Sequence, residues 1–168
     1  VVKDAVRVVS CGDDGTVRVW DAIKGGDALL VLEGHTGAVF GLSTFVVNGT
    51  VRVVSCGQDW TICIWDAIDG GDALQVLRGY AGTVWGVTTF DVNGNVRVVS
   101  CGDETVRVWA IEGGVALQVL HGHSSRVLGV TTFVVNGKVR VVSCGDDGTV
   151  RICDAEEGGD ALVVLRGH

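Results

Sequence analysis

The sequence has no proline and no methionine, and only 6% of its 168 residues are aromatic. Hydrophobic residues nevertheless make up 47% of the chain, valine is the most frequent of them, and there are 26 glycines. Valine favours strands, and glycine accepts the positive backbone angles that tight turns between strands require. Because good helix formers are few, we expect an all-β fold with almost no helix. Because no initiator methionine is present, we expect Val1 to be a processing or cloning boundary.

Clustered positive charge and long apolar runs are also absent. The formal net charge is -7, and no run of Lys or Arg is present to neutralise the phosphates of a nucleic acid. We therefore expect no nucleic-acid partner, and a cationic or neutral partner fits better. No apolar run approaches the roughly 20 residues that span a bilayer, and the start of the chain lacks the features of a signal peptide. We expect a soluble chain that does not bind membranes.

A repeated stretch organises the sequence. VRVVSCGDDGTVRVWDA begins at Val6, and related versions begin at Val51, Val96 and Val139. The offsets between these valines are 45, 45 and 43 residues, and the first and fourth copies are identical over their first 13 residues. The stability of such a chain is approximately a sum over units and over contacts between neighbouring units. The four repeat units are residues 1–34, 35–79, 80–122 and 123–168.

Turn signals divide each unit into four short strands. In the second unit, Val39 to Val47 is an apolar run that ends at Asn48-Gly49, the strongest short hairpin signal. The strands that we expect to follow it are Val51–Cys56, Thr61–Asp66 and Ala73–Leu77. Each unit is therefore a four-stranded antiparallel meander with two apolar faces. A single sheet of this size cannot bury both faces, so the units must stack face to face.

Several residues at fixed spacing carry a family resemblance. His35 precedes Trp65-Asp66 by 30 residues, Ser55 and Asp59 lie between them, and the pattern recurs along the whole chain. This pattern resembles the WD repeat. The resemblance implies a β-propeller, in which each repeat forms one four-stranded blade and the blades stand around an axis. We expect four blades in this chain, the first lacking most of its innermost strand.

The two ends of the chain are in register with each other. Val1-Val2 align with Val46-Val47, and Gly167-His168 align with Gly34-His35, so the chain stops where another unit would begin. The resemblance implies a ring of about seven or eight blades, within the range known for propellers. We therefore expect a homodimer that forms an eight-bladed ring. A fragment of a longer propeller and a small four-bladed ring are the alternatives.

The six cysteines have neither disulfide-framework nor zinc-site spacing. One thiol per unit forms no C-x-x-C pair, so we expect free, buried thiols in strands, which suit a reducing compartment such as the cytoplasm. His121 and His123 lie two residues apart, but no third ligand is in view, so we expect no metal site and no cofactor. Four cysteines recur at one position of the repeat: Cys11, Cys56, Cys101 and Cys144. The other two, Cys63 and Cys153, do not.

Ser55, His35 and Asp59 are the residue types of a hydrolase triad. Repetition argues against catalysis, because the serine and the aspartate recur in every unit and no G-x-S-x-G motif surrounds a serine. In WD repeats the matching Trp, Ser, His and Asp form a buried hydrogen-bonded tetrad, and the resemblance implies the same structural role here. The residues at these positions are His35, Ser55, Asp59, Trp65, Ser10, Asp14, Trp20, Ser100, Asp103, Trp109, His123, Ser143 and Asp147.

Only the second unit has all four members of this tetrad. The first unit has no histidine of its own, and His168 has the residue type and register to supply one across a ring closure. In the third unit Tyr80 replaces the histidine and Ala110 follows Trp109, and in the fourth unit Cys153 replaces the tryptophan. Since loss of a packed tryptophan costs about 3–5 kcal/mol, we expect unequal stability among the blades.

Function is expected to depend on residues that differ between otherwise similar units. The resemblance implies that WD-repeat propellers bind peptides and proteins on the face formed by the loop before the first strand and the turn between the second and third strands. Exposed aromatic residues with acidic neighbours are typical of a binding hot spot, and we expect Tyr80 to join them there. The partner-binding residues predicted on this face are Phe40, Trp60, Trp85, Arg126, Leu128, Asp13, Gln58 and Asp146.

We therefore predict a non-catalytic scaffold that binds a protein or a peptide and pairs with a second copy of itself. The alternatives are a purely structural, self-assembling half-propeller, a fragment of a larger signalling protein, and a hydrolase that uses a pocket on the same face. A strongly perturbed acidic group in such a pocket would favour the hydrolase.

Overall fold

The structure is a computed structural model that describes residues 6–167. Residues 1–5 and His168 lie outside the described residues, and with them the predicted alignment of Val1-Val2 and the predicted role of His168. Residues 6–167 form four antiparallel sheets, which confirms the all-β prediction. In this part of the chain we find no helix of the length and apolarity that a membrane crossing requires.

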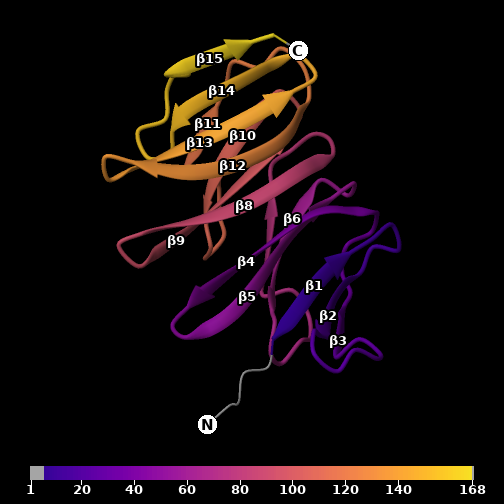
Figure 1. The fold of residues 1–168 in the computed structure, drawn as a ribbon. Coiled ribbons are helices and arrows are strands. Elements are labelled where there is room, and N and C mark those ends of the chain that lie inside the picture. The colour runs from indigo at the N-terminus through magenta and orange to yellow at the C-terminus, as the bar shows by residue number, and fades with distance from the viewer. Residues whose placement is uncertain (1–5, 168) are drawn as a thin grey trace.

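The four sheets are four blades that follow one another along the chain (Figure 1). Within residues 6–167, blade 1 has three strands and each of the other blades has four, which agrees with the prediction that the first blade lacks most of its innermost strand. In every blade the strands pair in chain order, which is a meander. The strands are, in blade 1, β1 (Arg7–Cys11), β2 (Val17–Asp21) and β3 (Leu30–Leu32); in blade 2, β4 (Val39–Val47), β5 (Thr50–Gly57), β6 (Thr61–Asp66) and β7 (Gln75–Arg78); in blade 3, β8 (Val84–Val92), β9 (Asn95–Gly102), β10 (Thr105–Ala110) and β11 (Gln118–Leu120); and in blade 4, β12 (Val127–Val135), β13 (Lys138–Gly145), β14 (Thr149–Asp154) and β15 (Val163–Arg166).

Asn-Gly turns set the register between the first two strands of blades 2, 3 and 4. In blade 2, Asn48 and Gly49 have φ angles of 50° and 75°, and Val47 pairs directly with Thr50. Two successive positive φ angles give a turn whose twist matches that of the flanking strands, and asparagine and glycine adopt them at low cost. The hairpin predicted at Asn48-Gly49 is therefore present, and blades 3 and 4 have equivalent turns at Asn93-Gly94 and Asn136-Gly137.

Each innermost strand carries a β-bulge near its start. In β4 the register shifts between Val39 and Gly41, so Phe40 has no partner across the sheet, and Trp85 and Leu128 occupy the same place in β8 and β12. A Cβ atom on Gly41 would lie 3.0 Å from the sulfur of Cys56, so a larger residue here would force neighbouring atoms to shift. A bulge redirects the extra side chain away from the ladder. This places three large side chains at the same end of three neighbouring strands.

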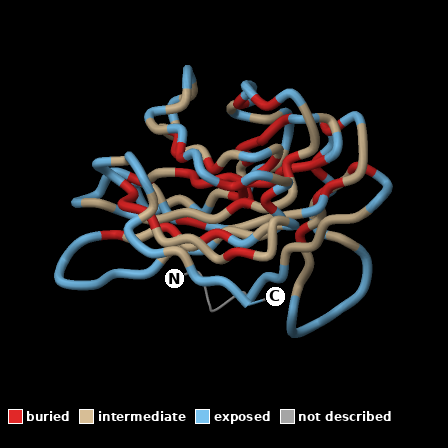
Figure 2. Tube along the Cα trace, turned by 90° about the horizontal axis from the view of Figure 1, so that it is seen from above, coloured by how far each residue is buried: buried red, intermediate tan, exposed pale blue. Residues whose placement is uncertain are grey.

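The core consists of three hydrophobic clusters, one at each junction between neighbouring blades. At the junction of blades 2 and 3, Ile62 and Leu77 from one sheet pack in the same cluster as Val98 and Trp109 from the next. Figure 2 shows the buried residues concentrated in the strands, whereas the connecting loops are exposed. Burial of this kind contributes about 1.5–3 kcal/mol for each large apolar side chain. Each blade therefore depends on its neighbours for its stability.

The outer faces of the two terminal blades expose residues that are buried elsewhere. Leu77 in blade 2 is 1% exposed, whereas Leu165 at the same position of blade 4 is 52% exposed. On the opposite face, Val98 in blade 3 is fully buried, whereas Val8 at the same position of blade 1 is 51% exposed. Within residues 6–167 no hydrophobic cluster joins blade 1 to blade 4. The described chain is thus an open arc with two unlike apolar ends.

The burial of the cysteines also depends on whether a neighbouring blade covers them. Cys56 and Cys101 are fully buried between blades, and burial raises the pKa of both thiols. Cys144, at the same position of blade 4, is exposed, and Cys11 in blade 1 is half-buried. The prediction that these thiols are all buried is therefore wrong for Cys144, because no blade of the described chain covers its face.

Candidate functional site

The loops before the innermost strands and the turns between the second and third strands lie at one edge of the blades, which we call the top face. Backbone hydrogen bonds join the two segments: the Gln58 N–H donates to the Ala38 carbonyl at 2.8 Å, and the Asp146 N–H donates to the Arg126 carbonyl at 2.9 Å. Neighbouring blades are also joined, because the Val127 N–H donates to the Asp103 carbonyl at 2.9 Å. The top face is therefore continuous from blade to blade.

In blade 2 a chain of buried hydrogen bonds supports this face. The indole N–H of Trp65 donates to the Ser55 hydroxyl at 2.8 Å, and the Ser55 hydroxyl lies 2.8 Å from Nε2 of His35. Nδ1 of His35 donates to the Asp59 carboxylate at 2.9 Å, and the Thr36 N–H donates to the same carboxylate at 3.0 Å. The chain links β6, β5, the loop and the turn, and buried polar groups that satisfy one another in this way fix a single arrangement.

Blade 4 has the same arrangement without the tryptophan. His123 lies 2.9 Å from the Ser143 hydroxyl through Nε2 and 2.9 Å from the Asp147 carboxylate through Nδ1. Cys153 occupies the tryptophan position and is buried in the junction with blade 3. The histidine, serine and aspartate therefore hold the loop without an indole donor.

In blade 3 a tyrosine takes the place of the histidine. The Tyr80 hydroxyl donates to the Ser100 carbonyl at 2.9 Å, and the Trp109 indole donates to the Ser100 hydroxyl at 2.8 Å. Tyr80 is only 7% exposed, and burial raises the pKa of its hydroxyl far above the usual range. The expectation that Tyr80 joins the exposed aromatics is therefore wrong, because its ring fills the buried histidine position. The Ala81 N–H still donates to Asp103, at 3.2 Å.

In blade 1 the same positions are occupied except that of the histidine. The Trp20 indole donates to the Ser10 hydroxyl at 2.8 Å. Asp14 accepts hydrogen bonds from the N–H and the hydroxyl of Thr16, at 3.0 and 2.8 Å, and from Arg18 at 2.7 Å. No residue of the described chain provides the imidazole.

The geometry of blade 2 resembles a Ser-His-Asp triad but does not suit catalysis. A nucleophilic serine must reach the scissile carbonyl of a substrate. Ser55 is 0% exposed and Ser143 is 3% exposed, and the Ser55 hydroxyl already accepts the Trp65 N–H. These contacts favour a structural role over the hydrolase alternative.

Hydrogen bonds also control the charge of the tetrad aspartates. Burial acts to raise the pKa of Asp147, but hydrogen bonds from Thr149, the Ser124 N–H and His123 outweigh it. The pKa of Asp147 consequently lies well below its usual range. The pKa of Asp59 is lowered by the equivalent bonds, again against the effect of burial. In the folded protein both carboxylates are therefore charged at neutral pH.

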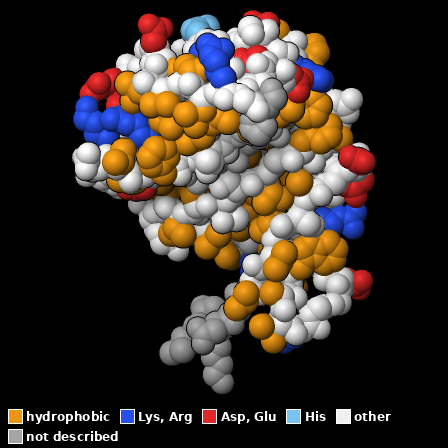
Figure 3. Space-filling model, turned by 45° about the horizontal axis from the view of Figure 1, so that its top comes forward, with side chains coloured by type: hydrophobic (Ala, Val, Ile, Leu, Met, Phe, Trp, Pro, Cys, Tyr) orange, Lys and Arg blue, Asp and Glu red, His pale blue; other side chains and the backbone are white. Residues whose placement is uncertain are grey.

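Four of the predicted partner-binding residues come together on the top face. The rings of Phe40 and Trp85 are stacked, with centroids 5.0 Å apart and an interplanar angle of 19°. The guanidinium of Arg126 lies 5.8 Å from the Trp85 ring, and its Nε donates to Asp146 at 2.8 Å. We call these four residues the top-face cluster. Phe40 is 40% exposed, and hydrophobic side chains with charged groups between them are visible on the surface of the molecule (Figure 3).

The other four predicted residues are exposed and take no part in these ring, cation–π and ion-pair contacts. Trp60 is 52% exposed and has a φ angle of 67°, at the position where blades 1 and 4 have glycine. Among residues 6–167, these four have no ring stacking, hydrogen bond or ion pair with the cluster: Leu128, Trp60, Asp13 and Gln58.

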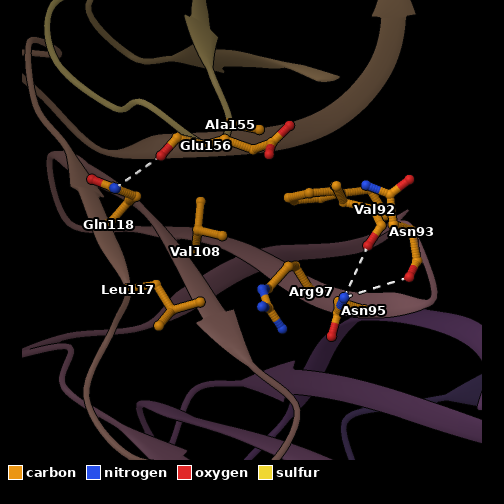
Figure 4. A pocket seen from close by; sticks show the side chains of 10 residues that line it. Val92, Asn93, Asn95, Arg97, Val108, Leu117, Gln118, Ala155 and Glu156 are labelled. Carbon is orange, nitrogen blue, oxygen red and sulfur yellow. Dashed lines mark hydrogen bonds between the residues drawn. The ribbon is translucent and has the colours of Figure 1, made fainter. Parts of the chain in front are cut away.

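A pocket that the sequence did not predict lies at the opposite edge of the molecule, between blades 3 and 4. In blade 2, Arg52 pairs with Asp66, and blade 4 has the equivalent pair. Ala110 stands at the aspartate position in blade 3, so Arg97 has no such partner there and instead lines a pocket of about 270 Å³ with Gln118 (Figure 4). The sequence shows Ala110 at the aspartate position, but the repeat pattern alone does not show that Arg97 lies opposite it and lines a pocket.

The comparisons with known proteins agree with this architecture. The family model described as "WD domain, G-beta repeat" matches residues 3–21, 26–66, 71–110 and 114–154. The chain belongs to the WD40 repeat family. WD40 repeats are in general non-catalytic scaffolds for protein interaction. The matched repeats are offset from the blades by one strand: residues 26–66, for example, contain β3 of blade 1 and β4 to β6 of blade 2.

This WD40 chain is also similar to the crystal structure of the computationally designed Ika8 protein. The identity is 37% and the TM-score is 0.77, and the match covers 100% of this chain and 48% of the designed one. The chain therefore spans about half the length of that protein. No curated protein matches the sequence.

Substitution of Asp147 by Asn is expected to lower stability in a pH-dependent way. Because the folded pKa lies below the unfolded value of about 3.9, the charged carboxylate stabilises the fold above that pH, and this contribution is lost as the pH falls toward the folded pKa. Asp147→Asn should therefore cost about 1–3 kcal/mol at pH 7 and less at pH 3, measured by urea denaturation. Asp146→Asn, which removes an exposed ion pair, is the control and should cost less than about 1 kcal/mol. Equal losses for Asp147→Asn at both pH values would contradict the assignment.

Proposed function

We propose that this chain is a scaffold that binds a cationic peptide or protein segment on its top face and pairs with a second copy to complete its ring. The observation that supports binding of a cationic segment is the top-face cluster. Phe40 is 40% exposed beside Trp85, and an exposed aromatic ring attracts a Lys or Arg side chain, as the Trp85 ring does with Arg126 within the chain.

The charge around the cluster supports a cationic partner. Asp13 and Glu104 are exposed at the turns of blades 1 and 3 and form no ion pair among residues 6–167, and the whole chain carries a net charge of -7. Acidic groups of this kind steer cationic partners and raise their rate of association. A reducing compartment such as the cytoplasm is part of the proposal, because the thiols are free and most are buried.

The two apolar ends of the arc support pairing with a second copy. The outer face of blade 4 has the residues that blades 2 and 3 use to contact the next blade, and the outer face of blade 1 has the residues that blades 3 and 4 use to contact the preceding one. The two ends are thus the two halves of a junction that the chain already makes between its own blades. The match to about half of a designed chain twice as long is consistent with a ring of two such arcs.

Pairing is expected to depend on Leu165. Its counterparts Leu77 and Leu120 are buried against the next blade, so Leu165→Lys should place a charge in the junction and weaken pairing by roughly tenfold or more. Leu162→Lys is the matched control, because Leu162 is exposed and its counterpart Leu74 stays 47% exposed inside the arc. The association constant is measured by sedimentation velocity over a range of concentrations. Equal weakening by both substitutions, or by neither, would contradict pairing through this face.

Peptide binding is expected to depend on Trp85. A displayed library of random peptides should yield binders that carry Lys or Arg beside an aromatic residue, and Trp85→Ala should weaken them by about tenfold or more. Val115→Ala, in an exposed loop at the opposite edge, is the control and should leave the affinity unchanged. Fluorescence anisotropy of labelled binders measures both effects. Binders that are acidic, or that tolerate Trp85→Ala, would rule out this site.

A further inference from the structure

No residue of the described chain fills the histidine position of blade 1. In blades 2 and 4 the imidazole lies between a serine hydroxyl and an aspartate, and in blade 2 the Thr61 hydroxyl also lies 3.2 Å from Nδ1 of His35. Blade 1 has Ser10, Asp14 and Thr16 at these three positions. They line a pocket of about 270 Å³ together with Arg18.

The side chains of this pocket already have the geometry of the complete sites. The Trp20–Ser10 distance of 2.8 Å equals the Trp65–Ser55 distance in blade 2. Thr16 donates to Asp14 at 3.0 and 2.8 Å, and its counterpart in blade 4 donates to Asp147 at the same two distances. An incoming imidazole would therefore meet a preorganised acceptor and hydroxyl, which lowers the cost of binding.

Gly12 indicates that a loop, and not only a ring, fits into this pocket. A Cβ atom at its counterpart Gly57 would lie 2.4 Å from the carbonyl oxygen of Ala38, and one at Gly145 would lie 2.5 Å from that of Arg126. Both carbonyls belong to the loop that carries the tetrad histidine. A Cβ on Gly12 would meet only Asp14, at 3.5 Å. Blade 1 thus keeps the glycine that loop docking requires, although the described chain supplies no loop there.

Arg18 and Asp14 are the counterparts of two groups that, in other blades, contact the residues on either side of the tetrad position. In blade 2 the second carboxylate oxygen of Asp59 accepts the N–H of the residue after the histidine, Thr36. In blade 3 the counterpart of Arg18, Arg107, donates at 2.6 Å to the carbonyl of Gly79, the residue before the tetrad position. The Arg18–Asp14 pair is exposed and of little net stability, so both groups are available for these bonds.

The inner edge of β1 extends the site. In blades 2, 3 and 4 the strand that follows the loop pairs along the whole inner edge of the second strand. In the described part of blade 1, β1 pairs only with β2, so its inner edge has no strand beside it. An extended segment placed after the docked histidine would add to this edge by ordinary strand pairing.

We propose that this pocket binds a Gly-His-Xaa segment, and that the segment comes from a second copy of the chain. The imidazole lies between Ser10 and Asp14, the glycine carbonyl accepts from Arg18, and the N–H of the residue that follows donates to Asp14. The origin of the segment in a second copy rests on the pairing proposed above. The segment is the Gly167-His168 pair of that copy, and His168 lies outside the described residues.

A titration with a synthetic peptide tests the pocket itself. The probe has the sequence of residues 33–45, EGHTGAVFGLSTF, with three lysines added for solubility, and the control peptide has alanine in place of the histidine. Binding to the full chain is followed by the NMR signals of a labelled imidazole and by calorimetry with both peptides. The histidine peptide should bind saturably and at least tenfold more tightly than the alanine peptide. Equal affinities would overturn the proposal.

Two variants of the chain make this test specific. Gly12→Ala should leave the stability of the chain close to that of the wild type, because its Cβ has room, and should abolish peptide binding through the backbone clash. Ser10→Ala should reduce binding by about tenfold through the loss of a buried hydrogen bond to the imidazole. Full binding by Gly12→Ala, with unfolding curves that match those of the wild type, would overturn the docking mode.

The supplier is tested by pairing of the full chain without peptide. His168→Ala should weaken pairing by about tenfold, and His121→Ala, which changes an exposed histidine, should not. Unchanged pairing of His168→Ala would overturn supply by the second copy. The experiments distinguish failure of the pairing proposal from failure of the pocket proposal. A chain that stays monomeric but binds the histidine peptide contradicts pairing and supports peptide binding in the pocket.

Discussion

The structure depends on one constraint: a four-stranded blade has two apolar faces and cannot bury either of them by itself. The three junctions between blades meet this constraint by joining opposite faces of successive sheets, and all three hydrophobic clusters lie at these junctions. The exposure of a side chain is therefore decided by whether a neighbouring blade is present. Leu77 and Leu165 occupy the same position of the repeat, and only the first has a blade against it. The ends of the arc consequently expose apolar side chains that a neighbouring blade would bury.

The polar sites on the top face work together with this apolar packing. Apolar contacts between blades are not directional, whereas the hydrogen bonds of the Trp, Ser, His and Asp residues fix the loop against the turn and so align the top face. The arrangement tolerates substitution when the replacement finds a partner. Tyr80 does so through the Ser100 carbonyl, and Cys153 fills the tryptophan position as a small buried residue. The functional surface can then vary, because its supporting layer is the same in each blade.

Most of the fold could be predicted from the sequence, because its signals are local and repeated. The ends of β4 and β6 coincide with the predicted strands Val39–Val47 and Thr61–Asp66, since an Asn-Gly turn and a tight turn bound them. The fourth strand of blade 2 was placed two residues early at its start, where the glycine pair gives only a weak boundary signal.

The surroundings of individual side chains were harder to predict. The sequence pattern does not show that Tyr80 substitutes for a buried histidine, because an aromatic ring in a loop is equally compatible with exposure. Cys144 shares its local sequence with Cys56, and its exposure depends on a blade that the described chain lacks. The stacking of Phe40 on Trp85 follows from bulges in two different strands, which residue spacing alone does not reveal.

The central claim is that the two open ends of this arc are the two halves of one junction. The most direct test is the solution mass of the chain by light scattering coupled to size-exclusion chromatography. The account predicts one species with twice the 17.5 kDa mass of the chain. A monodisperse species of 17.5 kDa, at concentrations where both apolar ends are free to meet, would contradict it.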